Sequence, residues 1–230
     1  MTPLPIDQSL PDIVQSLRQC PSLVLVAPPG AGKTTRVPPA ILRAGLLPAE
    51  HPNLLMLQPR RIAARAAAMR IAQENGWTVG REVGYHIRFE RAIGPTTRLR
   101  VLTEGILTRQ LLADPLLEGV GAVLLDEFHE RSIHTDLAIA LLRQLQSARP
   151  ELLLVVMSAT LDARKAAKYL GGCPVIRVEG RMHPVQITYM PREHEPLPHR
   201  IATALQQTLN EPGDVLVFLP GMDEICRTMR

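Results

Sequence analysis

Aromatic side chains and cysteines are scarce in this chain. Aromatic residues account for 3% of its 230 residues, so a core has to be built mainly from Leu, Val, Ile and Ala. That composition favours helices layered on a parallel sheet over an all-β sandwich. The cysteines are isolated and odd in number, at Cys20, Cys173 and Cys226, and they indicate neither a disulfide framework nor a metal cluster.

Long apolar runs are also missing. The longest one, residues 152–157, is far shorter than the roughly 20 residues that a transmembrane helix needs. The first residues combine prolines with acidic side chains and lack the basic-then-apolar pattern of a secretory signal. We therefore expect a soluble protein of the reducing cytoplasm that has no membrane partner.

Lysine occurs only as Lys33, Lys165 and Lys168, so arginine carries most of the positive charge. The net charge of +4 is a mild basic bias that is compatible with a polyanionic partner. Hydrophobic residues make up 46% of the chain and charged residues 21%, which is ordinary for a globular protein with a core. The length allows one large domain, or one domain and part of another.

Short apolar runs of strand length recur along the chain and are apolar on both faces. They occupy residues 22–27, 53–58, 98–103, 121–126, 151–157 and 174–179. Between them lie amphipathic stretches that predict helices, such as residues 61–75 and 136–148. This alternation predicts an α/β fold, a doubly wound and mostly parallel sheet with helices on both faces.

The composition changes near residue 180, where the chain becomes rich in proline, histidine and charge. Beyond this stretch come a predicted helix at residues 199–210, a Pro-Gly turn, and an apolar strand at residues 214–220. We expect residues 1–180 to form a first domain. Residues 181–230 would be a linker and the opening elements of a second α/β domain.

The first apolar run leads into the sequence APPGAGKTT. Gly30 and Gly32 let the backbone turn so that its N–H groups face phosphates, Lys33 reaches the β- and γ-phosphates, and the Thr34 hydroxyl is placed to bind Mg²⁺. The helix that begins here adds its N-terminal dipole. The predicted nucleotide-binding loop consists of Ala27, Pro28, Pro29, Gly30, Ala31, Gly32, Lys33, Thr34 and Thr35.

This loop departs from the general pattern at Ala27, where glycine is usual and where small residues are tolerated. Pro38 and Pro39 follow within a few residues, and we expect them to disturb the helix after its first turns. Nucleoside and small-molecule kinases carry similar loops, but they also need an arginine-rich lid and an acceptor pocket.

A second motif is GAVLLDEFHERS, in which an apolar strand runs directly into ionisable residues. A phosphate loop needs a carboxylate at the end of a neighbouring strand to hold Mg²⁺ and a base to orient the attacking water. We predict Asp126 on the metal side and Glu127 as the general base, and we expect both of them to belong, with Thr34, to the metal site. A zinc site of His129 and His134 is disfavoured, because five residues along a helix turn the two side chains about 140° apart.

These segments resemble, in their order along the chain, the motifs of DExH/DEAH-box superfamily 2 helicases. The matches are APPGAGKTT with motif I, QPRRIAARAAAMR with motif Ia, VGYHIRFE with a DEAH-type segment, TEG with motif Ib, DEFHERS with motif II, SAT with motif III and VFLPGMDEI with the start of motif IV. The resemblance covers nearly the whole chain. It implies a RecA-like first domain, the beginning of a second RecA-like domain, and the use of ATP with Mg²⁺.

The resemblance also implies roles for particular residues. Contacts to the nucleic-acid backbone would fall to Arg60, Arg61, Thr103 and Gly105. Arg70 would stack on the adenine ring. Coupling of the nucleotide state to the interdomain cleft would fall to His129, Ser158 and Thr160. Arginines and exposed N–H groups suit phosphate contacts without base readout, and although such contacts do not distinguish RNA from DNA, the DEAH resemblance favours RNA.

Family members carry motifs V and VI on their second domain, including arginines that complete the ATP site, and these 230 residues do not contain them. An arginine finger contributes about 10³–10⁵ to the rate of phosphoryl transfer. We therefore expect this chain alone to bind ATP–Mg²⁺ but to hydrolyse it slowly, with the remainder of the helicase chain as its partner. The alternatives are a DNA helicase and an ATP-switched nucleic-acid-binding scaffold without unwinding activity.

Overall fold

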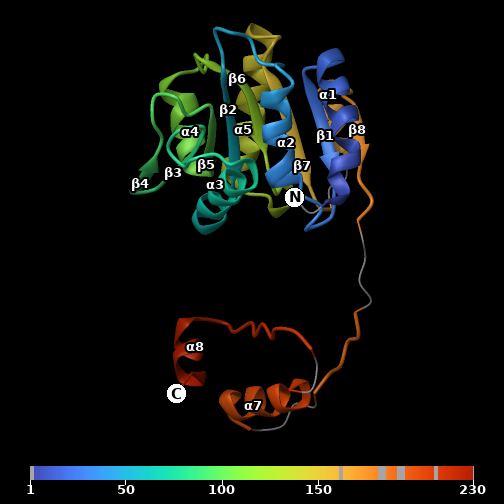
Figure 1. Ribbon diagram of the computed structural model, residues 1–230, viewed down its shortest axis with the longest axis vertical. Coiled ribbons are helices and arrows are strands. Elements are labelled where there is room, and N and C mark those ends of the chain that lie inside the picture. Colours follow the sequence, from blue (N-terminus) through green and yellow to red (C-terminus); the bar gives the residue numbers. More distant parts are fainter. Residues whose placement is uncertain (1–2, 161–162, 181–184, 191–194, 210–211, 230) are drawn as a thin grey trace. The chain divides into compact units, whose positions relative to one another are not determined.

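The computed structural model describes residues 3–160, 163–180, 185–190, 195–209 and 212–229. The chain divides into two units, residues 1–181 and 182–230 (Figure 1). The first unit contains one sheet with helices on both faces, and the second contains two helices. No helix in the described part of the chain is long and apolar enough to cross a membrane.

Eight strands form the sheet of the first unit, in the order β4-β3-β5-β2-β6-β7-β1-β8. All neighbouring strands run parallel except β3 and β4, which form an antiparallel hairpin. The strands are β1 (Ser22–Val26), β2 (Asn53–Gln58), β3 (Val83–Ile87), β4 (Glu90–Ala92), β5 (Leu99–Thr103), β6 (Val120–Leu125), β7 (Leu153–Ser158) and β8 (Val175–Arg177). Six of them lie where the apolar runs predicted strands, so the predicted parallel sheet is confirmed.

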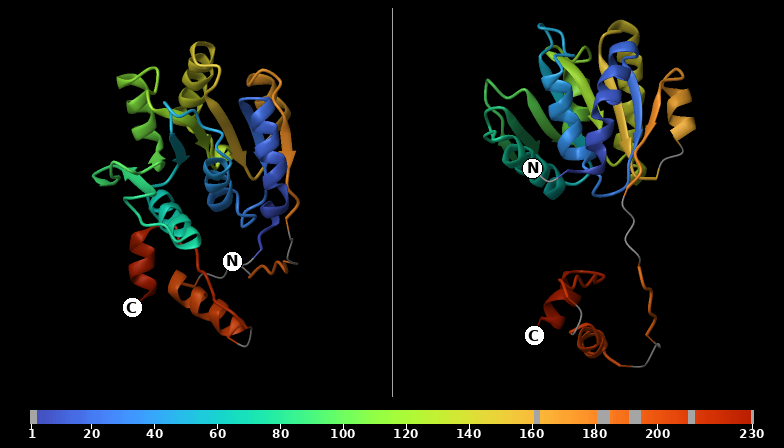
Figure 2. Two further views of the ribbon diagram at one scale, coloured as in Figure 1. Left: turned by 45° about the horizontal axis from the view of Figure 1, so that its top comes forward. Right: turned by 45° about the vertical axis from the view of Figure 1, so that its right-hand side comes forward.

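Helices cover both faces of this sheet, which explains why its central strands are apolar throughout. One face packs against α1, α2 and α3, and the other packs against α4, α5 and α6 (Figures 1 and 2). Successive strand residues alternate between the two cores, as Val24 and Leu25 do in β1. The helices are α1 (Leu10–Gln19), α2 (Lys33–Arg43), α3 (Arg61–Asn75), α4 (Glu104–Ala113), α5 (Ile133–Ala148) and α6 (Ala163–Tyr169), with short 3₁₀ turns at η1 (Pro5–Ser9) and η2 (Phe128–Glu130).

The helix that follows the phosphate loop differs from its prediction. α2 continues through Pro38 and Pro39 to Arg43, and both prolines are buried. Their missing N–H groups remove only the main-chain hydrogen bonds to the carbonyls of Thr34 and Thr35. Both proline rings are buried, and α2 continues through them, so the expected disturbance at Pro38 and Pro39 does not end the helix.

The second unit contains α7 (Leu197–Thr208) and α8 (Met222–Thr228). α7 lies close to the helix predicted at residues 199–210. The strand predicted at residues 214–220 is not formed, and that prediction is wrong for this structure, because a strand is defined by hydrogen bonds to a neighbour and no described segment pairs with these residues. The interpretation of residues 181–230 as the opening of a second RecA-like domain stays a prediction.

The carboxyl ends of the parallel strands meet at one edge of the sheet, which is where ligands bind in folds of this class. The phosphate loop follows β1, Asp126 follows β6, and Ser158 ends β7. β7 lies between β1 and β6. The strand that carries Asp126 is therefore the next but one to β1, and not the immediate neighbour that the motif predicted.

Candidate nucleotide-binding site

The phosphate loop is held in a left-handed turn at its two glycines. Gly30 has φ 76° and Gly32 has φ 96°, a region that strongly favours glycine. A Cβ atom on Gly32 would lie 2.7 Å from Leu4 Cδ1, so a side chain there would have to displace Leu4. The Ala31 carbonyl accepts a hydrogen bond of 3.1 Å from the N–H of Ile6, so the residues before the first helix support the loop from outside.

Lys33 is the first residue of α2, and its ammonium group lies 2.9 Å from Oε1 of Glu127. The Lys33 side chain is only 4% exposed and that of Glu127 is 27% exposed. This ion pair joins the phosphate loop directly to the end of β6. It places the predicted phosphate-binding cation beside the predicted general base.

Asp126 is buried, and three donors surround its carboxylate. Oδ2 accepts hydrogen bonds from the Thr34 hydroxyl at 2.6 Å and from Nε2 of Gln58 at 2.5 Å, and Oδ1 accepts the N–H of Glu127 at 2.9 Å. Burial raises the pKa of Asp126 above its usual range, and the negative charge of Glu127 adds to this effect, while the Thr34 hydroxyl, the charge of Lys33 and the backbone N–H act against it. The sequence predicted Thr34 and Asp126 but not Gln58, which comes from β2.

The residues at this point fit a Mg²⁺ ion. Hydroxyl and carboxylate oxygens are the protein ligands that Mg²⁺ prefers, and Thr34 and Asp126 already lie within hydrogen-bonding distance of each other. Glu127, the residue after Asp126, forms an ion pair with Lys33. Among the described residues, no three His, Cys, Asp or Glu side chains gather into another metal site, and His129 and His134 line different cavities.

The His129 side chain, in the motif II segment, contacts both Glu127 of that segment and Ala159 of the SAT segment. Its Nδ1 atom is 3.4 Å from Oε2 of Glu127 and 3.4 Å from the N–H of Ala159. One nitrogen cannot donate to a carboxylate and accept from an amide at the same time, and both distances are long, so each contact is weak. Ser158 lies beside them at the end of β7, fully buried, and its hydroxyl has no hydrogen-bond partner in the described part of the chain.

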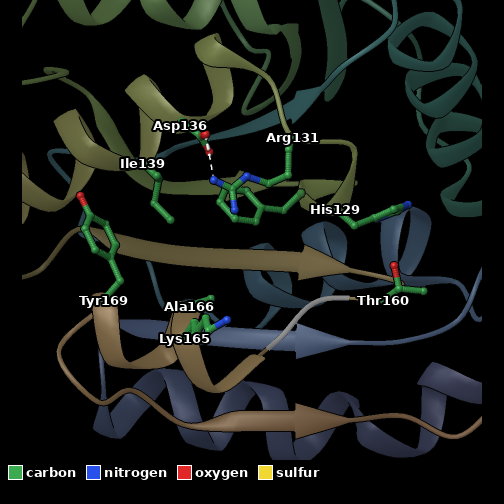
Figure 3. A pocket seen from close by; sticks show the side chains of 9 residues that line it. His129, Arg131, Asp136, Ile139, Thr160, Lys165, Ala166 and Tyr169 are labelled. Carbon is green, nitrogen blue, oxygen red and sulfur yellow. Dashed lines mark hydrogen bonds and ion pairs between the residues drawn. The ribbon is translucent and has the colours of Figure 1, made fainter.

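Thr160 and His129 line the same end of a cavity of about 600 Å³ (Figure 3). The cavity lies beside α5 and α6, where the guanidinium of Arg131 binds Asp136 at 2.8 Å. The structure therefore brings His129 and Thr160 together at one cavity, and Ser158 lies buried two residues before Thr160. Their coupling roles remain predictions.

The predicted nucleic-acid contacts separate into two places. Arg61, Thr103 and Gly105 line one cavity of about 590 Å³. Arg60 is not among its lining residues. The Arg60 guanidinium instead pairs with the Glu130 carboxylate at 3.3 Å.

The sequence analysis assigned no role to other residues of the 590 Å³ cavity, which include His86, Arg88 and Phe89 of the VGYHIRFE segment and also Arg109. Phe89 is 88% exposed and has φ 71°, in the turn between β3 and β4, and the Arg88 guanidinium lies 4.7 Å from its ring centre. Burial, with the charges of Arg91 and Arg109, lowers the pKa of His86. An Arg-Phe pair in a chain so poor in aromatic residues is the signal that could have found this turn.

Arg70 lines a third cavity, of about 480 Å³, together with Thr34, Gln58 and Glu127. It comes from α3, and its guanidinium binds the Glu74 carboxylate, one turn further along that helix, at 2.6 Å. Arg70 therefore lies close to the phosphate site. Its predicted contact with adenine is not tested by this arrangement.

The fold and the site together define a phosphate-loop α/β domain of the class that binds nucleoside triphosphates. Residues 8–169 match the family model described as DEAD/DEAH box helicase, and this chain belongs to that family. The predicted family resemblance is thereby confirmed, and with it the RecA-like fold of the first unit.

Relatives of this chain are known in Escherichia coli. One protein of strain K12, described as ATP-dependent RNA helicase HrpB, is 44% identical over 230 residues, which are 99% of this chain and 28% of that protein. A crystal structure of the E. coli DEAH/RHA helicase HrpB matches with a TM-score of 0.89 at 43% identity, over 99% of this chain and 29% of that one. A structure of the E. coli DExH-box NTPase HrpB matches with a TM-score of 0.79 at 43% identity, over 100% of this chain and 28% of that one. The chain thus spans less than a third of the length of these relatives.

Proposed function

We propose that this chain is the ATP-binding and nucleic-acid-contacting part of an ATP-dependent RNA helicase. The observation that carries the proposal is the pair of contacts between the phosphate loop and the end of β6, Lys33 with Glu127 at 2.9 Å and Thr34 with Asp126 at 2.6 Å. The similarity to an E. coli RNA helicase supports RNA as the nucleic acid.

In the proposed reaction, the loop N–H groups and Lys33 bind the phosphates of ATP. Thr34 and Asp126 would hold Mg²⁺, which neutralises charge on the phosphates when bound, and Gln58 fixes the orientation of the Asp126 carboxylate. Before ATP enters, Lys33 and Glu127 neutralise each other. A γ-phosphate competes for Lys33, and the Glu127 carboxylate is then released to orient a water molecule and accept its proton.

The nucleic acid would lie over the cavity lined by Arg61, Thr103 and Gly105. Arginines there neutralise backbone phosphates without reading bases. Phe89, exposed on the β3–β4 turn, offers a face on which a base can stack. Arg88 beside that ring adds a charge suited to a phosphate of the same strand.

ATP hydrolysis by the full-length protein, measured with single-stranded RNA and single-stranded DNA of one sequence, tests this proposal. We expect RNA to raise the rate more than DNA does, and Lys33→Ala to abolish the activity with both. Equal stimulation by both would support the DNA or mixed-substrate alternative. Lack of stimulation by either nucleic acid would contradict the proposal.

A further inference from the structure

Glu104 stands between Thr103 and Gly105 and lines the same cavity of about 590 Å³, while its carboxylate binds side chains of another element. Its Oε2 accepts a hydrogen bond of 2.8 Å from the Ser132 hydroxyl, and its Oε1 accepts one of 2.6 Å from the Thr135 hydroxyl. Ser132 is the N-cap of α5 and accepts the N–H of Thr135 at 3.0 Å. We call these three side chains, Glu104, Ser132 and Thr135, the Glu104 clamp.

The clamp joins the first turns of two helices. Glu104 begins α4, and Ser132 and Thr135 begin α5. A carboxylate is stabilised at a helix N-terminus by the helix dipole, and hydrogen bonds to a charged acceptor are stronger than neutral ones. Thr135 is buried and Glu104 is half-buried, so water competes little for these bonds.

The segment between β6 and the clamp carries Glu127 and His129. Two of its residues, Glu127 with φ 50° and Arg131 with φ 44°, have left-handed backbone that side chains other than glycine seldom adopt. Such a conformation persists only where the surroundings hold it. At one end the holding contacts are those of Asp126 and Lys33 with Glu127, and at the other end it is the Glu104 clamp.

We infer that Glu104 is a positioning residue, which transmits nucleic-acid binding at Thr103 and Gly105 to the catalytic position of Glu127. A phosphate bound by the start of α4 shifts that turn, and through the clamp it shifts the start of α5 and the six-residue segment from Glu127 to Ser132. The exposed ion pair between Arg60 and Glu130 offers a second link, but a solvated one that contributes little. This inference rests on the proposed function.

A purely structural role for the clamp would change the two hydrolysis rates, with and without nucleic acid, in a different way. If the bonds only stabilised the two helix ends, their loss would lower the melting temperature and slow hydrolysis by the same factor with and without nucleic acid. A transmitting role changes the ratio of the two rates, because nucleic acid then binds without moving Glu127.

The test measures ATP hydrolysis by the full-length protein as a function of single-stranded RNA concentration, for the wild type, Glu104→Ala, Thr135→Val and the double variant. Fluorescence anisotropy gives the RNA affinity and thermal unfolding the melting temperature. We expect Glu104→Ala to lower the RNA-stimulated kcat about tenfold and to lower the unstimulated rate by a clearly smaller factor, so that the ratio of the two rates falls. Thr135→Val removes one of the two hydrogen bonds to the Glu104 carboxylate, so it should lower the stimulated kcat by a smaller factor and should add nothing in the double variant.

Glu118→Ala is the matched control, because Glu118 is exposed beyond the end of α4 and its backbone N–H donates to the Asp114 carboxylate at 2.8 Å, a bond that the substitution keeps. It should leave the stimulation unchanged. Full stimulation of Glu104→Ala, or equal slowing of both rates, would overturn the inference while the proposed function stands. If RNA did not stimulate ATP hydrolysis by the wild type, both the inference about Glu104 and the proposed function would be contradicted.

Discussion

The ion pair at the centre of the candidate site joins a lysine that is predicted to bind phosphate to a glutamate that is predicted to accept a proton. Lys33 and Glu127 form a partly buried ion pair at 2.9 Å, so each side chain restrains the position of the other. The predicted roles of the two residues, phosphate binding by Lys33 and proton acceptance by Glu127, can be tested separately. A neutral amide at residue 127 keeps the size of the side chain but cannot take up a proton.

We expect Glu127→Gln to bind ATP with an affinity close to that of the wild type and to hydrolyse it about 10²–10⁴ times more slowly, the usual contribution of a general base. Fluorescent-nucleotide binding and phosphate release measured on the full-length protein check the two quantities. Glu130→Gln is the control in the same segment, because its exposed pair with Arg60 is worth little. Equal hydrolysis by Glu127→Gln and the wild type would rule out Glu127 as the base.

Gly30 and Gly32 both have positive φ, but only Gly32 is crowded, by Leu4 and Ile6. Gly30→Ala should therefore cost about 1–2 kcal/mol of folding free energy from backbone strain alone. Gly32→Ala should cost about 1–3 kcal/mol more, because a side chain there is forced into a packed site. Urea unfolding followed by circular dichroism measures the difference, and equal costs would contradict the packing argument.

The local residues of the site were predictable from the sequence, whereas their distant partners were not. Lys33, Thr34, Asp126 and Glu127 belong to motifs in which type and spacing specify the chemistry. Gln58 contacts Asp126 across 68 positions of the chain, and that contact depends on β2 lying beside β6. No local pattern carries this information.

At the scale of elements, the end of α5 is tied to the turn before β6 by one buried arginine. Nη1 of Arg149 donates to the carbonyls of Leu116 at 2.8 Å and Leu117 at 3.0 Å, and its Nε binds Glu151 at 2.8 Å. The arginine thus supports the strand that ends in Asp126 from its opposite end.

We expect Arg149→Ala to lower the free energy of unfolding by about 2–4 kcal/mol, because it leaves two carbonyls without their donor and opens a cavity. Glu151→Ala removes only the exposed partner and should cost below about 1 kcal/mol. Chemical denaturation of both variants measures the two losses. A cost of Glu151→Ala equal to that of Arg149→Ala would contradict this account.

The predicted elements succeeded where burial on both faces left a continuous apolar run, as in β6 and β7. β3 and β4 were not predicted, because glycine, histidine and charge interrupt their sequence at the edge of the sheet. The run at residues 214–220 shows the converse, since its apolar pattern is present but no described segment pairs with it. Strand propensity becomes a strand only where a neighbour completes its hydrogen bonds.

At the scale of the whole molecule, Cys173 and Cys226 lie in different units and differ in exposure, so their reactivity can be used to follow each unit separately. Cys173 is buried in the first unit, and burial raises the pKa of its thiol to about 11. Cys226 is exposed on α8 in the second unit. The thiolate is the reactive form, so at pH 8 only about 0.1% of a thiol with such a pKa can react.

We expect a thiol reagent at pH 8 to modify Cys226 rapidly and Cys173 much more slowly in the native protein. Raising the pH towards the pKa of Cys173 should speed its modification, because deprotonation then becomes less costly. Mass spectrometry of digested protein identifies which thiol reacted. Modification of both at one rate in the native protein would contradict the burial of Cys173.

The contact between Ile6 and Ala31, with Leu4 packed over Gly32, has a practical consequence for handling this protein. Alignment on the first strand makes the residues before it look like a dispensable leader, and trimming or tagging there is a common step in expression. Here that stretch forms the outer wall of the phosphate loop. A shortened protein that begins at β1 would lose nucleotide affinity without any change to a motif residue, and the loss would be easily mistaken for an inactive enzyme.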